Sequence, residues 1–298
     1  MKTLLLVAAA LCGISAQAQS LSFTSGVVTD YTNITLNISG PSNLVCQVER
    51  LNIYTQQWDL QGYVPLSNGL GSFSSTMDLS YYGFFRCRGT NWSYLSTNAF
   101  AAVSGYVPNG YSILGNPFAA MSITNIMPTA STNTLVYQFN NATTNYTTSK
   151  YMAGRWFLPV TVNQLEAVMV SNPGYQFRYI VSGLIPTNSI SKNIPSGLSL
   201  QCSPIYQMMD PYTGQVDLLT TNLFGGNSSL PVRSVGFSNE CNLLFLTNSY
   251  AWEYQTYALS NSTWNTYGWP TSVPLKFMEG FWVQKPTNAV WNTRFRVW

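Results

Sequence analysis

The chain contains no histidine, and of its 298 residues only 13 are basic and 10 acidic. Histidine is the commonest general base and metal ligand, so Ser-His-Asp, Cys-His and HExxH chemistries are excluded. The net charge of +3 comes without any Lys/Arg cluster and gives no electrostatic footprint for nucleic acid. Neither GxxxxGK[ST] nor a GxGxxG between a strand and a helix is present. We therefore expect no nucleotide chemistry, no metal and no cofactor.

Long apolar runs are missing after the first residues, so we expect no transmembrane helix. The beginning of the chain is different. A short positive segment, Met1-Lys2-Thr3, precedes the apolar run Leu4–Ile14 and the small-residue sequence Ala16-Gln17-Ala18. This order predicts a signal peptide over residues 1–18, cleaved before Gln19. The expected location is secreted, either extracellular or on the outer cell surface.

Cysteine is scarce, with five residues in the chain, and Cys12 falls inside the predicted signal. The other four allow three disulfide connectivities in an oxidising compartment. Local pairing within each domain favours Cys46–Cys87 and Cys202–Cys241. The alternative is four buried free thiols.

Aromatic and β-branched residues are abundant, including 19 Tyr and 9 Trp. Runs of four to seven such residues alternate with turn clusters such as Pro108-Asn-Gly110, Asp210-Pro-Tyr-Thr-Gly214 and Gly225-Gly-Asn-Ser-Ser229. No stretch after the signal has sustained helical periodicity, although residues 160–170 could form one short helix. The sequence predicts an all-β fold.

The last two thirds of the chain contain an internal repeat. Four ordered matches carry it: Gly110–Pro117 with Gly197–Pro204, Leu135–Asn140 with Leu243–Asn248, Tyr146 and Trp156 with Tyr254 and Trp264, and Leu165–Pro173 with Met278–Pro286. Matches of this length predict tandem domains. We expect three β-sandwich-like domains, the last two an internal duplication sharing one strand topology: 19–104, 105–190 as copy one, and 191–298 as copy two with an insertion at 206–240.

The first domain alternates apolar and polar residues, as at Ile34, Leu36 and Ile38. Its Glu49-x-Leu51, Trp58-x-Leu60 and Phe84-Phe-Arg-Cys-Arg88 sequences resemble the fibronectin-III/immunoglobulin-like module of exported proteins of environmental Gram-negative bacteria. The two repeats are similar to another, uncharacterised all-β module of the same exported proteins. In that module a glycine precedes the glutamate, where this chain has Leu165 or Met278. The resemblance implies fold and export, and assigns no activity or catalytic residues.

Two sets of residues are candidates for function. Glu166 and Glu279 are scarce carboxylates, and a glycosidase needs two within about 5–10 Å. They occupy equivalent positions in different domains, so we favour a structural role in which their oxygens accept backbone N–H bonds at a repeated turn. Tyr146 and Trp156 are equivalently repeated and are interpreted as a core pair. Aromatic faces stack on sugar rings, and the candidates peculiar to copy two are Trp252, Trp269, Trp282 and Tyr257.

These observations favour a non-enzymatic protein for extracellular binding, adhesion or surface assembly. The expected partners are polysaccharide or other cell-surface components, and self-association is possible. Copy two is the expected binding region, because it carries the insertion and six of the nine tryptophans. Two alternatives remain open: a carboxylate-only glycoside hydrolase and a self-assembling structural subunit.

Overall fold

A computed structural model describes residues 20–29, 32–52, 57–76, 82–90, 92, 94–186, 189–202, 215–217, 241–248, 253–260, 263–266, 269–270, 274–276 and 278–294. The fold is all-β, as predicted. Within these ranges the single helix is α1 (Ile123–Ile126), and no helix there is long and apolar enough to cross a bilayer. The predicted signal peptide and most of the 206–240 insertion lie outside the described residues.

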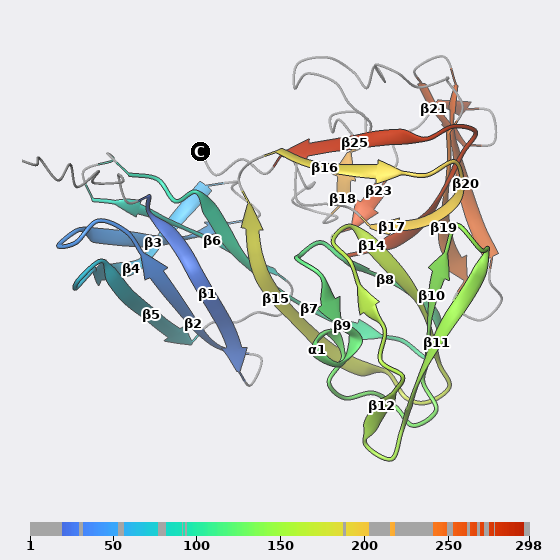
Figure 1. The fold of residues 1–298 in the computed structure, drawn as a ribbon, viewed down its shortest axis with the longest axis horizontal. Coiled ribbons are helices and arrows are strands. Elements are labelled where there is room, and N and C mark those ends of the chain that lie inside the picture. The colour runs from blue at the N-terminus through green and yellow to red at the C-terminus, as the bar shows by residue number, and fades with distance from the viewer. Residues whose placement is uncertain are drawn as a thin grey trace, which may run out of the picture.

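Two sheets form an N-terminal sandwich, with strand orders β1-β2-β5 and β15-β7-β6-β3-β4 (Figure 1). The strands are β1 (Ser22–Thr29), β2 (Asn33–Ser39), β3 (Val45–Asn52), β4 (Gln57–Pro65), β5 (Leu70–Thr76), β6 (Tyr82–Gly89), β7 (Asn98–Val107) and β15 (Phe177–Pro186). The predicted alternation on β2 is confirmed, because Ile34, Leu36 and Ile38 are buried between the sheets. The sandwich core therefore follows from a period of two in the sequence.

Strand β7 joins this sandwich to the rest of the molecule. It pairs along all ten residues with β15, from Asn98 opposite Pro186 to Val107 opposite Phe177. The boundary expected between residues 104 and 105 thus falls inside β7, and β15, expected in copy one, belongs to the sheet of the sandwich. Most of β7 is buried, because one face packs on the sandwich core and the other on the core of the second lobe.

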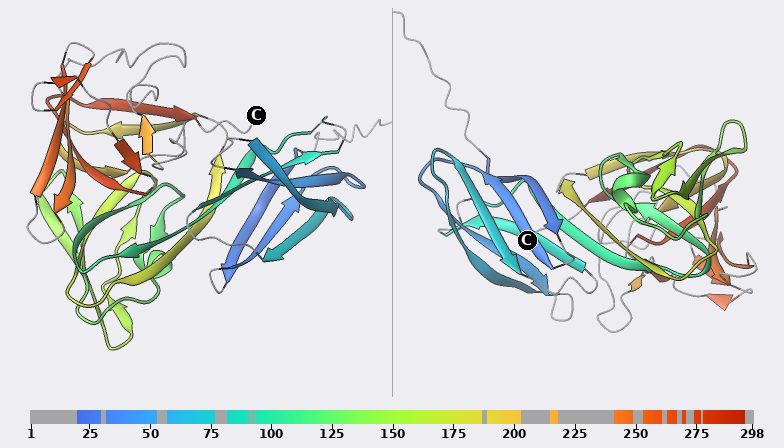
Figure 2. Two further views of the ribbon diagram at one scale, coloured as in Figure 1. Left: turned by 180° about the vertical axis from the view of Figure 1, so that it is seen from behind. Right: turned by 90° about the horizontal axis from the view of Figure 1, so that it is seen from below.

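The second lobe is built on an 11-stranded sheet and lies beside the sandwich (Figure 2). Its strands are β8 (Gly110–Asn116), β10 (Leu135–Asn140), β11 (Asn145–Met152), β12 (Arg155–Phe157), β14 (Glu166–Asn172), β17 (Gly197–Cys202), β19 (Cys241–Asn248), β20 (Glu253–Ser260), β21 (Thr263–Thr266), β22 (Trp269–Pro270) and β24 (Gly280–Lys285). Three strand pairs accompany it: β9 (Met121–Ser122) with β13 (Thr161–Val162), β16 (Ser189–Ile194) with β25 (Ala289–Arg294), and β18 (Gln215–Asp217) with β23 (Pro274–Lys276). The helix considered for 160–170 is replaced by β13 and the start of β14.

The two repeat segments have the same strand order. In the first, the neighbours run β8-β14-β10-β11-β12, and in the second β17-β24-β19-β20-β21. One strand differs from the sequence match by one residue. Tyr137 lies opposite Met169, and Leu244 lies opposite Trp282, which corresponds to Met169 in the repeat. Leu244 is therefore the structural counterpart of Tyr137, whereas the sequence match paired Tyr137 with Phe245. A one-residue slip exchanges the two faces of a strand, and apolar residues on both faces hide it in the sequence.

The predicted disulfides are not formed, since Cys46, Cys87 and Cys202 are free thiols. Cys46 lies opposite Gly89, and Cys87 lies opposite Val48, so the two cysteines are diagonal neighbours in one sheet. Diagonal positions are about 7–8 Å apart, beyond the usual Cα separation of a disulfide, up to about 6.8 Å.

The second predicted bridge fails for a different reason. Cys202 lies opposite Gly280, whereas the pairing of Asn242 with Gln284 places Cys241 beside Lys285. Five residues of strand separate these places by about 17 Å. The backbone register therefore excludes a Cys202–Cys241 bridge.

Candidate binding surface

The sheet face of β3, β4 and β6 that points away from the sandwich core gathers arginines and aromatic rings. Cys46, Val48, Phe85 and Cys87 point into the core, so the alternate residues point outward. Register sets them in rows: Gln47 lies between Tyr63 and Arg88, and Glu49 lies between Leu60 and Arg86. We call Trp58, Tyr63, Arg86, Arg88 and Trp92 the aromatic–arginine surface, in which Arg86 is itself buried and Trp58 partly buried.

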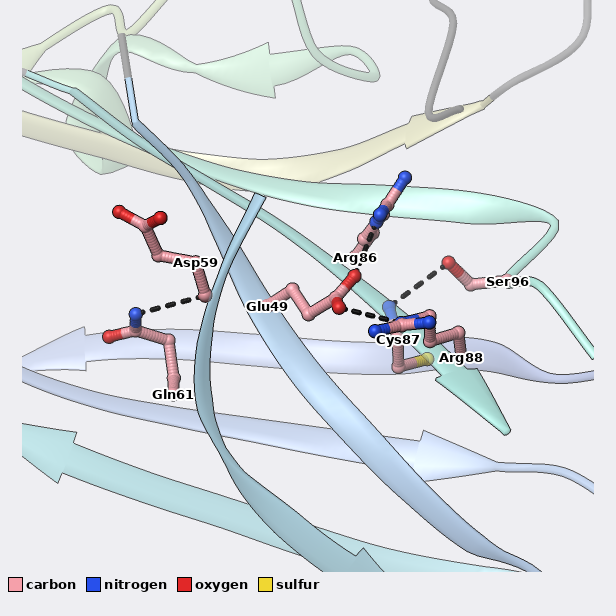
Figure 3. Close-up of polar contacts among 7 residues, drawn as sticks. All are labelled: Glu49, Asp59, Gln61, Arg86, Cys87, Arg88 and Ser96. Carbon is pink, nitrogen blue, oxygen red and sulfur yellow. Dashed lines mark hydrogen bonds and ion pairs between the residues drawn. The ribbon is translucent and has the colours of Figure 1, made fainter. Parts of the chain in front are cut away.

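Glu49 fixes both arginines (Figure 3). Arg86 Nε donates to Glu49 Oε2 and Arg88 Nε donates to Glu49 Oε1, each at 2.6 Å. Burial lowers the pKa of the Arg86 guanidinium from its ordinary value, and the hydrogen bond and charge of Glu49 oppose that shift. One carboxylate against two guanidinium groups leaves the cluster with a net positive charge.

Each arginine also lies over an aromatic ring. The guanidinium carbon of Arg86 is 4.5 Å from the centre of the Trp58 ring, and that of Arg88 is 3.3 Å from the centre of the Trp92 ring. Trp58 packs partly against the core of the second lobe, whereas Trp92 is 71% exposed. Because Arg88 covers one face of the Trp92 ring, the exposed area belongs to the opposite face.

Local structure explains why Trp92 stands out. Its N–H donates to Gly89 O at 3.0 Å, and the N–H of Gly89 donates to Tyr94 O at 2.8 Å, which closes a tight connection after β6. Trp92 has φ of 62°, a left-handed conformation that residues other than glycine rarely adopt. Strain of this kind persists where the surroundings hold it, often at binding sites.

The opposite edge of the surface is irregular. An extra residue in β4 breaks its register with β3 between Val48 and Glu49, and Gln61 Nε2 donates to Asp59 O at 3.1 Å there (Figure 3). A bulge in an edge strand hinders its pairing with another chain. Tyr63, two residues further on, is exposed.

Of the stacking residues predicted in copy two, the structure describes the side chain of Trp282 alone. Trp282 points away from the face of Phe281 and Val283, as expected, but it is buried. The centres of the Trp282 and Phe139 rings lie 5.0 Å apart in an edge-to-face arrangement. Trp282 is therefore covered by Phe139, while Phe281 and Val283 are buried on the other face of the sheet. Trp252 and the side chains of Trp269 and Tyr257 lie outside the described residues.

Of the repeated glutamates, Glu166 is placed differently from expectation. Glu166 Oε1 accepts from Lys192 Nζ at 3.0 Å and Oε2 from Asn163 Nδ2 at 2.9 Å, so its partners are side chains and not backbone N–H groups. Glu279 forms a backbone bridge with Leu114. The tyrosine–tryptophan pair separates: Trp156 is buried and donates to Met127 O, whereas Tyr146 is exposed beside Phe139.

No group of three His, Cys, Asp or Glu side chains that could hold a metal ion occurs among the residues described. Comparison of the sequence with known protein families and with curated proteins finds no match. The sequence analysis missed Trp92. The available signal was a tryptophan within the polar run Thr90-Asn91-Trp92-Ser93, directly after the strand that carries Arg86 and Arg88.

Proposed function

We propose that this chain is an exported, non-catalytic protein that binds extracellular polysaccharide through the aromatic–arginine surface of its N-terminal sandwich. The observation that carries the proposal is the Trp92 ring, exposed on one face and supported by Arg88 on the other. This moves the expected binding region from copy two to the first domain.

The chemistry of the surface suits a sugar ring. The C–H groups of a pyranose pack on an aromatic face, while its hydroxyl groups seek polar neighbours. Arg88 holds the Trp92 ring in place before a ligand arrives, and Glu49 in turn holds Arg88. A binding group that is already ordered loses little freedom on association, which favours affinity.

The charges favour binding over hydrolysis. Glycoside hydrolysis needs one carboxyl group that gives up a proton and another that acts as a base or nucleophile. Glu49 uses both oxygens on Arg86 and Arg88, and Glu166 uses both on Asn163 and Lys192. Both are engaged as ion-pair partners.

The test is retention of the purified mature chain on cellulose, chitin and peptidoglycan particles. We expect at least one of the three to retain the unaltered chain, and Trp92→Ala to weaken that retention by at least about tenfold, equivalent to about 1.4 kcal/mol. The thermal midpoint should change little, because Trp92 is largely exposed and alanine has the same left-handed backbone strain as tryptophan at this position.

A matched control is Tyr175→Ala, which removes an even more exposed ring, 93% against 71% for Trp92, from the second lobe. Retention equal to that of the unaltered chain is expected for this variant. The proposal fails if none of the three particles retains the unaltered chain, or if both substitutions reduce retention equally.

A further inference from the structure

The two repeat segments touch through contacts that occur in matched pairs. Gly115 N–H donates to Met278 O at 2.8 Å, and Cys202 N–H donates to Leu165 O at 3.1 Å. In the alignment of the segments, Gly115 corresponds to Cys202 and Leu165 corresponds to Met278. Each bond is therefore the counterpart of the other with the two segments exchanged.

The strand bridges between the segments repeat this exchange. Glu166 on β14 lies opposite Gln201 on β17, and Leu114 on β8 lies opposite Glu279. Leu114 corresponds to Gln201, and Glu166 corresponds to Glu279. Two bridges and two hydrogen bonds are thus related by one and the same exchange.

Backbone conformation matches at the residues that make these contacts. Leu165 and Met278 have φ of 63° and 62°, and both side chains are buried. Residues other than glycine rarely adopt this left-handed conformation, yet both segments keep it at the corresponding position. The shared geometry arises because each carbonyl must reach the N–H of the opposite segment.

The core between the segments is built from corresponding residues. Its buried members are Ile113, Ala167, Met169, Leu200, Cys202 and Trp282. Ile113 corresponds to Leu200 and Met169 to Trp282, so each segment supplies the same two places. The partly buried residues packed on this core, Tyr137 and Phe139 from β10 and Leu244 and Leu246 from β19, correspond in the same way.

Two corresponding pairs face each other directly. A Cβ atom added to Gly115 would lie 2.0 Å from the Cβ of Cys202. One added to Gly280 would lie 2.6 Å from the Cβ of Ala167 and 2.2 Å from Cγ2 of Ile113. Gly280 corresponds to Ala167. A residue that faces its own counterpart lies beside a two-fold axis, and the Gly115–Cys202 pair has room for one side chain only.

We propose that the repeat segments associate about a pseudo-two-fold axis through an isologous interface, so that the partner each segment fits is a second copy of itself. In a homodimer the same patch on each subunit forms such an interface. Here both partners are carried on one chain. That arrangement lets Gly115 and Cys202 differ, which two identical subunits could not do.

The test exchanges the residues at the axis in the full chain. Gly115→Cys puts two side chains in the space of one and should lower the thermal midpoint by about 5 °C or more. Cys202→Gly should also lower it by leaving a cavity. The double variant Gly115→Cys with Cys202→Gly moves the side chain across the axis, and should recover most of the loss.

A second exchange gives an independent measurement. Ala167→Gly with Gly280→Ala should likewise be more stable than Gly280→Ala alone, but with a smaller recovery, because Cγ2 of Ile113 still crowds the added methyl group. If Gly115→Cys does not fold but its double variant does, the recovery is confirmed in a stronger form. Losses that simply add in both double variants would overturn the proposal, because side chains that do not share one space act independently.

Discussion

At the scale of single residues, Glu49 is the carboxylate that neutralises two arginines in the sandwich. It is 2% exposed and is hydrogen-bonded to two guanidinium groups, one of them on a strongly buried side chain. A buried ion pair adds little net stability compared with an apolar replacement, but the loss of one partner leaves a charge with no counter-ion. The sandwich depends on this carboxylate more than on either arginine.

Glu49→Gln should therefore destabilise the protein strongly. The glutamine keeps the shape of the side chain and removes its charge, leaving Arg86 and Arg88 to repel each other. We expect a loss of about 3–5 kcal/mol in the free energy of unfolding, measured by urea titration. The matched control is Glu166→Gln, whose half-buried pair with Lys192 should contribute about 0–1 kcal/mol. Similar losses in the two variants would contradict this account.

At the scale of elements, neighbouring strands decide the state of the thiols. Cys46 on β3 and Cys87 on β6 both face the sandwich core, and the Cys46 thiol donates to Val64 O at 3.4 Å. Burial raises the pKa of the Cys46 thiol to about 11, and it also raises the pKa values of Cys87 and Cys202. A protonated thiol is a poor nucleophile, so these cysteines are protected by their positions.

Alkylation at pH 8 should leave Cys46, Cys87 and Cys202 unmodified in the folded protein and modify all three in urea without reductant. Peptide mass spectrometry gives the extent at each residue. Because the folded-state pKa of Cys46 lies above the ordinary value of 9.0, its contribution to stability is full below pH 9 and is lost between pH 9 and about 11. Failure of Cys46 and Cys87 to react in urea would indicate a disulfide.

The positions of the strands could be predicted from the sequence more fully than the side chains that cover their faces. The alternation on β2 and the order of the repeat matches are both features of local sequence. The structure buries the apolar residues of β2 and gives the two repeat segments the same strand order. The burial of Trp282 depends on Phe139, which lies far away in the sequence and covers the expected outer face. The Trp92–Arg88 stack depends on a left-handed residue, for which tryptophan gives no signal.

At the scale of the whole molecule, the β7–β15 pair links the stability of the two lobes. Ten residue pairs hold β15 to the sandwich, while β15 follows β14 of the large sheet by a connection of four residues, 173–176. Val103 and Val181 from these strands are buried in the same core as Val136 and Val168 of the second lobe. The sandwich and the first repeat segment therefore share one core.

Hydrogen exchange in increasing urea should show this coupling directly. Amides of β7 and β14 should converge on one opening free energy at the same urea concentration, because a shared core opens as one cooperative unit. Amides of β2 provide the comparison within the sandwich. Exchange of β7 at a urea concentration that leaves β14 fully protected would show that the lobes unfold separately.

The antiparallel β7–β15 ladder also determines how the chain responds to mechanical tension. Asn98 and Pro186 face each other at one end, and Val107 and Phe177 at the other, so residues 108–176 leave and return at adjacent points. A pull on the chain before β7 and after β15 acts at the Asn98–Pro186 end and opens the pairs one at a time, as in unzipping. Along the backbone, residues 108–176 are stretched only after the last pair of the ladder has parted, so the ladder protects this stretch of chain from tension applied at its two ends.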